Sequence, residues 1–167
     1  MCVCVTTYRG EGVVCGGITM FSKLEEEFLA SERVARIATI NVVDKSPHVV
    51  PVCFAFDGKA IYTTLYVRSR RLKNVREGSK VSVLVDRYVE EGGDWKVLCG
   101  LLIYGNVKVL SYFEDRSEFM RGWKLLMEKY PQYRQWAEAD LSPKDPDKRR
   151  IMRIQPTKAT RWGFEMV

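Results

Sequence analysis

Apolar and polar residues alternate along most of the chain after residue 20, and this two-residue period predicts β-strands. Runs rich in β-branched and aromatic residues, each bounded by turn-forming residues, occupy 35–43, 48–56, 60–66, 80–89, 95–110 and 151–156. Pro51 inside the second run predicts an edge strand or a bulge, because proline cannot donate to a sheet ladder. The sequence "DGK" after this run predicts a hairpin turn. In the longest run, Gly100 and Gly105 are the expected bulge or bend points.

Two capping boxes predict helices on either side of these strands. Ser22 is followed three residues later by Glu25, and Ser111 by Glu114, so each pair can satisfy backbone N–H groups at a helix start. The first helix is short and amphipathic, and the second is expected to end at about Lys129. The segment "WKLLMEKY" of the second helix is predicted to pack its apolar face on the sheet and not to contact a cofactor.

Hairpin-like turns connect most of these elements, which favours an antiparallel sheet over a parallel doubly wound one. We therefore expect a mainly β, α+β protein with about six strands and two or three peripheral helices, and the long glycine-bent strands favour a small closed barrel. Residues 1–19 hold three of the five cysteines and four of the 12 glycines, without a clear period. We interpret 1–19 as an N-terminal extension, either upstream of the natural start or a short extra strand or arm, and 20–167 as the domain.

Composition limits the class of protein. The chain has 167 residues and a formal net charge of +6, which permits an anionic partner without naming one. No apolar run approaches the roughly 20 residues that cross a bilayer, and the N-terminus lacks the features of a signal peptide. We expect a cytoplasmic protein without a membrane partner. Five cysteines without CxxC spacing and a single histidine, His48, argue against a disulfide framework, a metal site and a Ser-His-Asp triad.

The strongest chemical signal is a cluster of cations where a strand passes into a helix. The cluster consists of Arg68, Arg70, Arg71 and Lys73. Ser69 is the expected N-cap of this helix, and Gly78 is its expected end. A helix N-terminus offers free N–H groups and a partial positive charge, and arginine can bind phosphate oxygens through two parallel hydrogen bonds.

Two threonines, Thr63 and Thr64, end the preceding strand, and one of them can point its hydroxyl toward the same place. Together with Ser69, Arg70 and Arg71 they predict a site for a small phosphorylated ligand. The alternative that the residues leave open is a solvated charged surface, because cations on a short surface helix are common.

The order of segments carries a resemblance to a known family. A capped helix is followed by "ARIATI", by "HVVPVCFAFDGKAIYTT", by "SRRLKNV" and then by "GSKVSVLVD". This order resembles the FMN-binding split-barrel family of the pyridoxamine 5′-phosphate oxidase type. "KYPQYRQW" and the terminal "RWGF" are similar to a subgroup of small members regarded as probable coenzyme F420-dependent enzymes.

The resemblance implies a split β-barrel and assigns roles to several residues. Tyr62 and Thr63 match the family's aromatic–hydroxyl pair at a strand end. Arg70 and Arg71 match its Arg-Lys phosphate pair, with arginine in the second position here. The family's C-terminal "R-x-H" segment, which binds pyridoxal phosphate, has no match, so we do not expect a pyridoxamine phosphate oxidase.

The resemblance also implies where the rest of the cofactor lies. Val49, Val50, Pro51 and Val52 match the strand that runs along the isoalloxazine ring, and Trp162 matches an aromatic that reaches the flavin from near the C-terminus. Members of the family are homodimers with each cofactor at the subunit interface. A homodimer that acts on a small-molecule substrate is therefore expected.

The leading interpretation is an FMN-binding oxidoreductase of unknown substrate, with no catalytic side chain assigned, because the flavin carries the reaction. A coenzyme F420-dependent reductase is the alternative on the same fold, since both cofactors carry a phosphate on a ribityl chain. Alternatives of another class are a non-catalytic flavin-binding module and a basic nucleic-acid-binding module. Nucleic acid is not the expected partner, because the cations crowd one turn and do not alternate with exposed aromatics over a sheet face.

Overall fold

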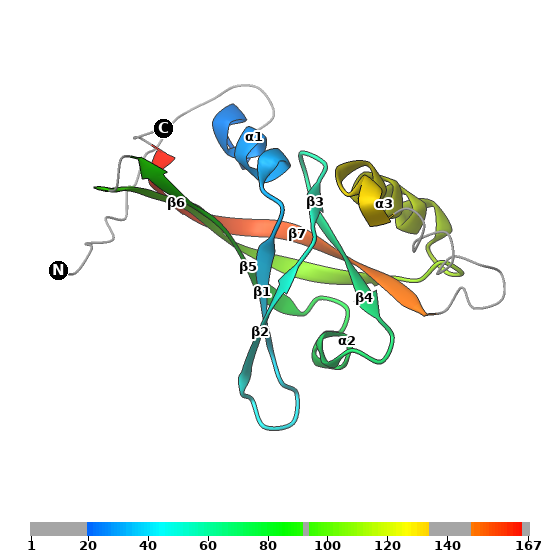
Figure 1. Cartoon of the computed structure of the whole chain (residues 1–167). Helices are drawn as coiled ribbons and strands as arrows, with labels where there is room; N and C mark the ends of the chain where they lie inside the picture. Colours follow the sequence, from blue (N-terminus) through cyan, green and yellow to red (C-terminus); the bar gives the residue numbers. More distant parts are fainter. Residues whose placement is uncertain (1–19, 92–93, 134–147, 165–167) are drawn as a thin grey trace, which may run out of the picture.

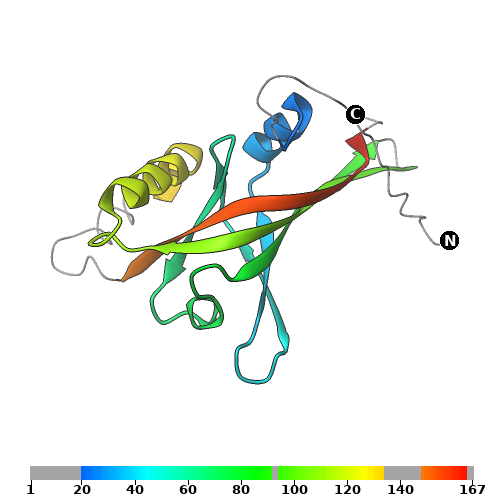
Figure 2. The ribbon, with the colours of Figure 1, turned by 180° about the vertical axis from the view of Figure 1, so that it is seen from behind.

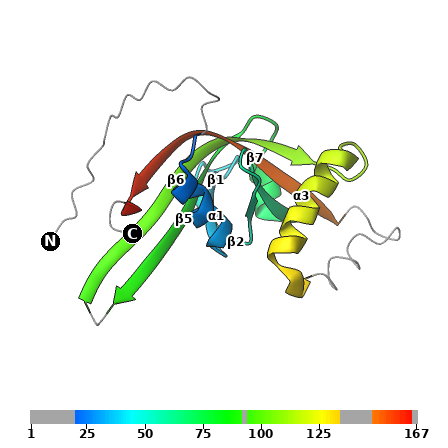
Figure 3. The ribbon, with the colours of Figure 1, turned by 90° about the horizontal axis from the view of Figure 1, so that it is seen from above.

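Seven antiparallel strands form one sheet in the computed structural model, which describes residues 20–91, 94–133 and 148–164. The extension predicted at 1–19 lies outside the described residues. The order of the strands in the sheet is β2-β1-β5-β6-β7-β4-β3. The strands are β1 (Ala35–Ile40), β2 (Pro47–Val52), β3 (Ala55–Phe56), β4 (Ile61–Tyr66), β5 (Lys80–Glu91), β6 (Asp94–Leu110) and β7 (Arg149–Trp162). The long pair β5 and β6 extends beyond the other strands, as Figure 3 shows.

The sheet curls around an apolar core. One cluster draws buried side chains from β1, β4, β5, β6 and β7 together. Ile37 of β1 and Leu65 of β4 are both fully buried in it, although three strands separate them in the sheet order. Because a flat sheet would keep β1 and β4 apart, the shared core requires a half-barrel. The predicted α+β class and antiparallel barrel-type sheet are confirmed. The full closure that the long strands favoured is not found, because β2 and β3 end the sheet and do not pair with each other in the described part of the chain. Helix α1 (Lys23–Ser31) lies above the curled sheet in Figures 1 and 2.

The first capping box is confirmed and the second is wrong. The Ser22 hydroxyl accepts from the Glu25 N–H at 3.3 Å, and the Glu25 carboxylate accepts from the Ser22 N–H at 2.7 Å. Helix α3 (Arg116–Lys129) begins only after Asp115, and the Ser111 hydroxyl accepts an N–H two residues on, in the turn before the helix. Serine makes such local turns as readily as it caps helices, which explains the error. The predicted helix end is confirmed.

Two predicted boundaries in the central region also need correction. Helix α2 (Arg70–Asn74) ends well before Gly78, because Val75 is already extended, with φ −116° and ψ 140°, and packs into the core. The strand predicted over 48–56 is interrupted after Val52, so that β2 and β3 are separate. This interruption accounts for the seventh strand, and it lies beside the cavity described below.

The predicted turn and one predicted bend point are confirmed. Gly58 has a φ of 86°, and the Asp57 N–H donates to the Ala60 carbonyl at 3.2 Å, which closes the hairpin from β3 to β4. The pairing of β6 with β7 slips between Tyr104 and Gly105. A Cβ at Gly105 would lie 2.7 Å from a backbone oxygen of β7, so glycine permits this close approach.

Helix α3 covers the outer face of the half-barrel, across β4 and β7 (Figure 1). Phe119, Trp123 and Leu126 of the helix form a second apolar cluster with Tyr62 of β4 and Ile151 of β7. A short 3₁₀ helix, η1 (Pro131–Tyr133), follows α3. No helix in the described part of the chain combines the length and the apolar character that a membrane crossing needs.

Candidate functional site

A cavity of about 340 Å³ lies beside β4 and the C-terminal half of α3. Its walls come from β2, β4, α2, α3, η1 and β7, which are far apart in the sequence. The residues that line it are Pro51, Val52, Cys53, Thr63, Thr64, Tyr66, Arg71, Trp123, Leu126, Met127, Tyr130, Tyr133 and Arg149. Five of the predicted site residues, namely Pro51, Val52, Thr63, Thr64 and Arg71, are therefore brought together.

Arg71 is the main electrostatic feature of the cavity. It is the second residue of α2, and its Nη2 donates to the Thr64 carbonyl at 3.3 Å. Its Nη1 is buried and has no hydrogen-bond partner among the described residues. Burial lowers the pKa of Arg71 below its usual range. Because a buried donor without a partner is costly, the arrangement suits an anion that accepts from Nη1.

The two threonines of β4 play different parts. Thr63 is 1% exposed, and its hydroxyl donates to the Cys53 carbonyl at 2.8 Å, so it fixes the cavity wall where β2 ends. Thr64 points to the opposite face of β4, toward α3, and its hydroxyl makes no hydrogen bond within the described residues. Thr64 thus leaves a donor and an acceptor for a ligand next to Arg71.

The predicted ring-binding strand reaches the cavity with its C-terminal end. Pro51 and Val52 line the cavity, and Cys53 follows them in the break before β3. Val50 packs against the core, and Val49 is 58% exposed on the outer face of β2, which is an edge strand. Neither Val49 nor Val50 lines the cavity of this chain.

The cap and the first arginine of the predicted phosphate site lie outside the cavity. The Ser69 hydroxyl accepts from the Leu72 N–H at 3.3 Å and caps α2. Arg70 is exposed and near Asp44, whose pKa is lowered mainly by hydrogen bonds from Ser46 and slightly by the Arg70 charge. Successive helical residues point about 100° apart, which is why Arg71 lines the cavity and Arg70 does not.

Tyr62 and Trp162 also lie elsewhere. The Tyr62 side chain is buried beneath α3, and its hydroxyl donates to Asp57 Oδ2 at 3.0 Å. Trp162 ends β7, about 40 Å along the strand from the cavity-lining Arg149. Its ring packs over Gly100, where a Cβ would collide with it, and its indole N–H is buried without a partner among the described residues.

Sequence reasoning missed the aromatic wall of the cavity. Trp123, Tyr130 and Tyr133 line it from α3 and η1, together with Leu126 and Met127. The apolar face of α3 packs on the sheet, as predicted for "WKLLMEKY", but the same face also borders the cavity. Residues spaced three or four apart on a helix look alike in the sequence whether they face a core or a ligand site, so no further signal was present.

A stacked pair forms part of the cavity lining where β4 ends. Tyr66 lies opposite Arg149 in the pairing of β4 with β7. The Arg149 guanidinium lies 4.0 Å from the centre of the Tyr66 ring, and its Nη2 donates to the Tyr66 hydroxyl. Tyr66 is 52% exposed, so this pair lies at the rim of the cavity.

Tyr130 fixes the wall where β2 breaks. Its hydroxyl accepts from the Phe54 N–H at 3.1 Å and lies 2.9 Å from the Phe54 carbonyl and 2.7 Å from the Arg33 carbonyl. Burial is the main cause that raises the pKa of Tyr130 to about 12, so the hydroxyl keeps its proton at neutral pH. The tyrosine therefore joins the end of α3 to the start of β1 and to the β2–β3 break.

Lys129 reinforces the same junction. Its Nζ donates to the Leu29 carbonyl at 2.8 Å and lies 3.9 Å from the centre of the Phe54 ring. Burial, followed by repulsion from Arg33, lowers the pKa of Lys129 to about 8. Burial of the charged form of Lys129 therefore costs free energy at the point where α1, α3 and the β2–β3 break meet.

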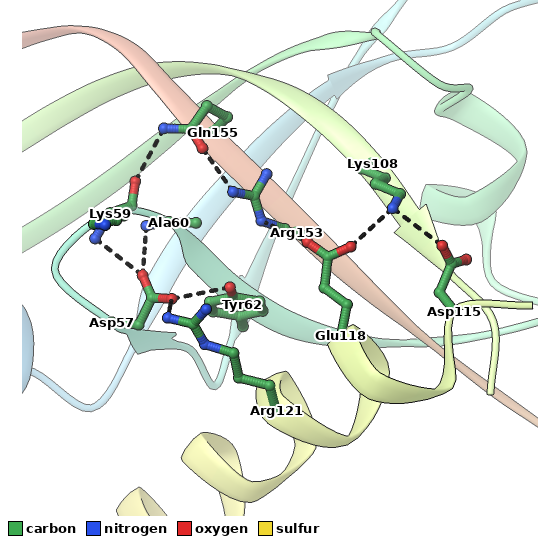
Figure 4. A network of polar contacts seen from close by, with 10 residues as sticks. All are labelled: Asp57, Lys59, Ala60, Tyr62, Lys108, Asp115, Glu118, Arg121, Arg153 and Gln155. Atoms are coloured by element: carbon green, nitrogen blue, oxygen red, sulfur yellow. Dashed lines mark hydrogen bonds and ion pairs between the residues drawn. The ribbon is translucent and has the colours of Figure 1, made fainter.

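A polar network holds the N-terminal half of α3 in place (Figure 4). Asp57 accepts from Tyr62 at 3.0 Å and from Arg121 of α3 at 2.6 Å. Lys108 of β6 contacts Glu118 of α3 at 2.8 Å. Burial acts to raise the pKa of Asp57, but hydrogen bonds from two backbone N–H groups and Tyr62 outweigh it and lower the pKa. These contacts anchor the helix that walls the cavity.

One comparison with known proteins shows the family of this chain. The family model described as pyridoxamine 5′-phosphate oxidase matches residues 21–163 of the chain. The comparison with curated proteins gives no match.

Several solved structures have the same fold. A conserved hypothetical protein from Mycobacterium tuberculosis is 23% identical, with a TM-score of 0.66 over 86% of this chain and 85% of its own. An FAD-binding protein from Mesorhizobium loti is 22% identical, with a TM-score of 0.57 over 83% and 92%. An F420 reductase is 20% identical, with a TM-score of 0.54 over 81% and 94%. At these identities the likeness shows the fold alone.

Proposed function

Because this chain belongs to the pyridoxamine 5′-phosphate oxidase family, we propose that it is an oxidoreductase that binds a phosphorylated flavin, with FMN as the leading cofactor. The single observation that carries this proposal is the buried Nη1 of Arg71, a cationic donor without a described partner in a residue that lines the cavity. A phosphate oxygen would satisfy it with a charge-assisted hydrogen bond.

The other cavity residues fit the same ligand. The Thr64 hydroxyl supplies a neutral donor beside Arg71, and the Trp123 and Tyr130 rings supply apolar surface for a ribityl chain or a flat ring. When bound, a flavin supplies hydride and electron transfer. The residues of this chain bind and orient it, and the aromatic wall excludes water. No side chain is assigned a role in proton transfer.

A coenzyme F420-dependent reductase remains the second candidate. The observation in its favour is the additional cation at the rim, Arg149, because F420 carries an acidic tail beyond its phosphate. The F420 reductase among the structural relatives supports the same alternative. FMN is preferred because, among the described residues of the cavity, Arg71 is the one that offers a buried cationic donor without a partner, which suits one terminal phosphate.

We further propose that two copies of the chain assemble around the cofactors. Val49, Ala38, Ser82 and Tyr104 stand side by side across β2, β1, β5 and β6, and Val49 and Tyr104 are exposed large side chains on this outer face. Trp162 lies too far along β7 to reach the cavity of its own chain. Burial of the face against a second copy would remove Val49 from water and allow Trp162 to approach the partner's cofactor.

The proposal is tested on the purified protein. A flavoprotein should be yellow, and mass spectrometry of the released small molecule should identify FMN. The apo-protein should also be titrated with FMN and with F420 at two salt concentrations, since ion pairs to an acidic tail are screened by salt. Tighter F420 binding with a steeper salt dependence would replace FMN by F420, and binding of neither would overturn the proposal. Bound FMN without reduction by any dihydronicotinamide or deazaflavin donor would indicate a carrier.

A further inference from the structure

The turn between β1 and β2, residues 41–46, forms an exposed apolar projection that we call the hairpin tip. β1 pairs with β5 as far as Ala38, whereas its pairing with β2 continues to Ile40. The hairpin therefore extends past the neighbouring strand, and Figures 1 and 2 show it projecting from one end of the molecule. Val42 is 41% and Val43 is 86% exposed at the hairpin tip. The two valines thus place aliphatic surface on a convex part of the protein.

Hydrogen bonds inside the hairpin tip pair several of its backbone groups. The Lys45 N–H donates to the Asn41 carbonyl at 3.0 Å, and the Val43 N–H donates to the Asn41 side-chain oxygen at 3.0 Å. The Lys45 ammonium donates to the Val42 carbonyl at 2.9 Å. Unpaired backbone groups are costly to move out of water, so these bonds lower the cost of bringing the hairpin tip into an apolar or interfacial medium.

Helix α2 is fixed beside this hairpin. Asn74 of α2 donates from its side chain to the Thr39 hydroxyl of β1 at 3.1 Å. Asp44 of the hairpin tip has a pKa below its usual value, mainly because its carboxylate accepts hydrogen bonds from Ser46, and the Arg70 charge of α2 also contributes. The one carboxylate of the tip is therefore engaged by its own turn and lies within the field of a cation of α2.

The hairpin tip and the segment around α2 give this end of the molecule a strong positive charge. Over 41–46 and 67–80, six exposed cations stand against two exposed acids, a balance of +4 in a chain whose formal net charge is +6. The cations are Lys45, Arg68, Arg70, Lys73, Arg76 and Lys80, and the acids are Asp44 and Glu77.

We propose that this end of the chain binds an anionic lipid surface, with Val42 and Val43 inserted at the level of the headgroups and the surrounding cations facing the lipid phosphates. The hairpin tip lies past the last residue pair of β1 and β2, beyond Ala38 and Val49 of the face proposed for a second copy. This peripheral contact goes beyond the proposed function and does not depend on it. It also departs from the expectation of no membrane partner, which rested on the lack of a long apolar run and so concerns spanning segments.

Two features favour a lipid surface over other anionic partners. The exposed apolar side chains at the hairpin tip are aliphatic, whereas proteins that bind single-stranded nucleic acid present aromatic rings on which the bases stack. A projecting tip needs a matching hollow on a folded protein partner, but a lipid surface yields to it and offers phosphates around the point of entry.

The first test measures co-sedimentation of the full chain with vesicles of phosphatidylcholine, alone or mixed with an equal amount of phosphatidylglycerol. Val43→Ser is compared with Val34→Ser, which changes an exposed valine between α1 and β1. We expect the wild type to bind only the vesicles with phosphatidylglycerol, and Val43→Ser to lower the partition coefficient roughly threefold or more, because part of the valine side chain enters the interface. Val34→Ser should stay within about twofold of wild type.

The second test removes one cation at a time. A basic residue near an anionic membrane surface strengthens binding by about fivefold, so Lys73→Gln should weaken binding to the mixed vesicles by that factor. Lys59→Gln is the control, because Lys59 is an exposed cation in the turn from β3 to β4, at the opposite end of β4 from α2. Its binding should stay within about twofold of wild type, since salt screens distant charges.

The outcomes keep this inference apart from the proposed function. A wild type that binds neither kind of vesicle would overturn it. Equal binding by Val43→Ser and wild type would mean that net charge alone attracts the protein, and complete displacement from the vesicles by duplex DNA at the same phosphate concentration would assign the cations to nucleic acid; either result also overturns it. FMN titration of the same proteins reports on the proposed function separately, because none of the substituted residues lines the cavity.

Discussion

Removal of the Tyr130 hydroxyl should destabilise the protein measurably and loosen the cavity. The hydroxyl is the acceptor for the Phe54 N–H at 3.1 Å and carries one proton that the Phe54 and Arg33 carbonyls share, at 2.9 and 2.7 Å. Tyr130 and Phe54 are 2% and 0% exposed, so water cannot easily replace the lost contacts. In Tyr130→Phe, a buried N–H without a partner costs about 1–3 kcal/mol.

The assay is thermal and guanidinium unfolding of matched variants. At about 2–4 °C per kcal/mol for a chain of this size, a loss near 2 kcal/mol lowers Tm by roughly 4–8 °C. Tyr133→Phe is the control, because that tyrosine is exposed and its hydroxyl makes no hydrogen bond within the described residues, so its change should stay within about 0.5 kcal/mol. FMN affinity should fall more in Tyr130→Phe than in the control, because loss of the hydrogen bonds to Phe54 lets the neighbouring Cys53 segment, which lines the cavity, shift. Equal stability of Tyr130→Phe and wild type would refute the role of this tyrosine at the junction.

Three further predictions follow from other contacts. The pKa of Lys129 is about 8 in the folded protein, below the usual 10.5, so the unfolded chain binds more protons between these two pH values. The free energy of unfolding of the wild type, measured relative to Lys129→Met by denaturation at several pH values, should therefore rise from pH 8 to 10, by less than about 1.4 kcal/mol per pH unit because the side chain is partly exposed. A difference between the two proteins that does not change with pH would contradict the lowered pKa. Gly122→Ala should lower the free energy of unfolding by about 1–2 kcal/mol in chemical denaturation, because the new Cβ would lie 2.6 Å from the Tyr62 ring. This loss should outweigh the better helix propensity of alanine. Unchanged or increased stability would show that the Tyr62 ring moves aside without cost. Light scattering at micromolar concentration should report twice the 19.3 kDa mass of one chain, and a cofactor-loaded monomer would exclude the proposed dimer.

The fold was predictable because local signals and global topology agree in most of the chain. The Ser22 capping box, the "DGK" hairpin and the Gly105 bend are each determined by residues close in the sequence, and each is found. The errors arise where the same residue is compatible with two local conformations. Ser111 serves a turn instead of a cap, and Val75 ends α2 early because the core holds it in an extended conformation.

The candidate site was predictable only in part. The sequence identifies a cationic strand-to-helix turn, but the choice between Arg70 and Arg71 depends on the direction of each side chain around a short helix. The Tyr66–Arg149 pair depends on the register between β4 and β7, which are more than 80 residues apart in the sequence. Tyr62 has the expected place in the chain, but its hydroxyl is directed to Asp57 by the network under α3. Its predicted contact with the cofactor, like those of Ser69, Arg70 and Trp162, stays a prediction.

The central claim is that Arg71 holds the phosphate of a flavin, and the most direct test compares Arg71→Gln with Arg70→Gln. The two arginines are adjacent, and only Arg71 of the two lines the cavity, so the pair controls for charge and for position in α2. Apo-protein is titrated with FMN and with riboflavin, which lacks the phosphate. We expect Arg71→Gln to weaken FMN binding roughly 10- to 100-fold, the equivalent of about 1.5–3 kcal/mol, with riboflavin unchanged and Arg70→Gln close to wild type for both ligands. Equal losses for FMN and riboflavin in Arg71→Gln, or a larger FMN loss in Arg70→Gln, would contradict the assignment.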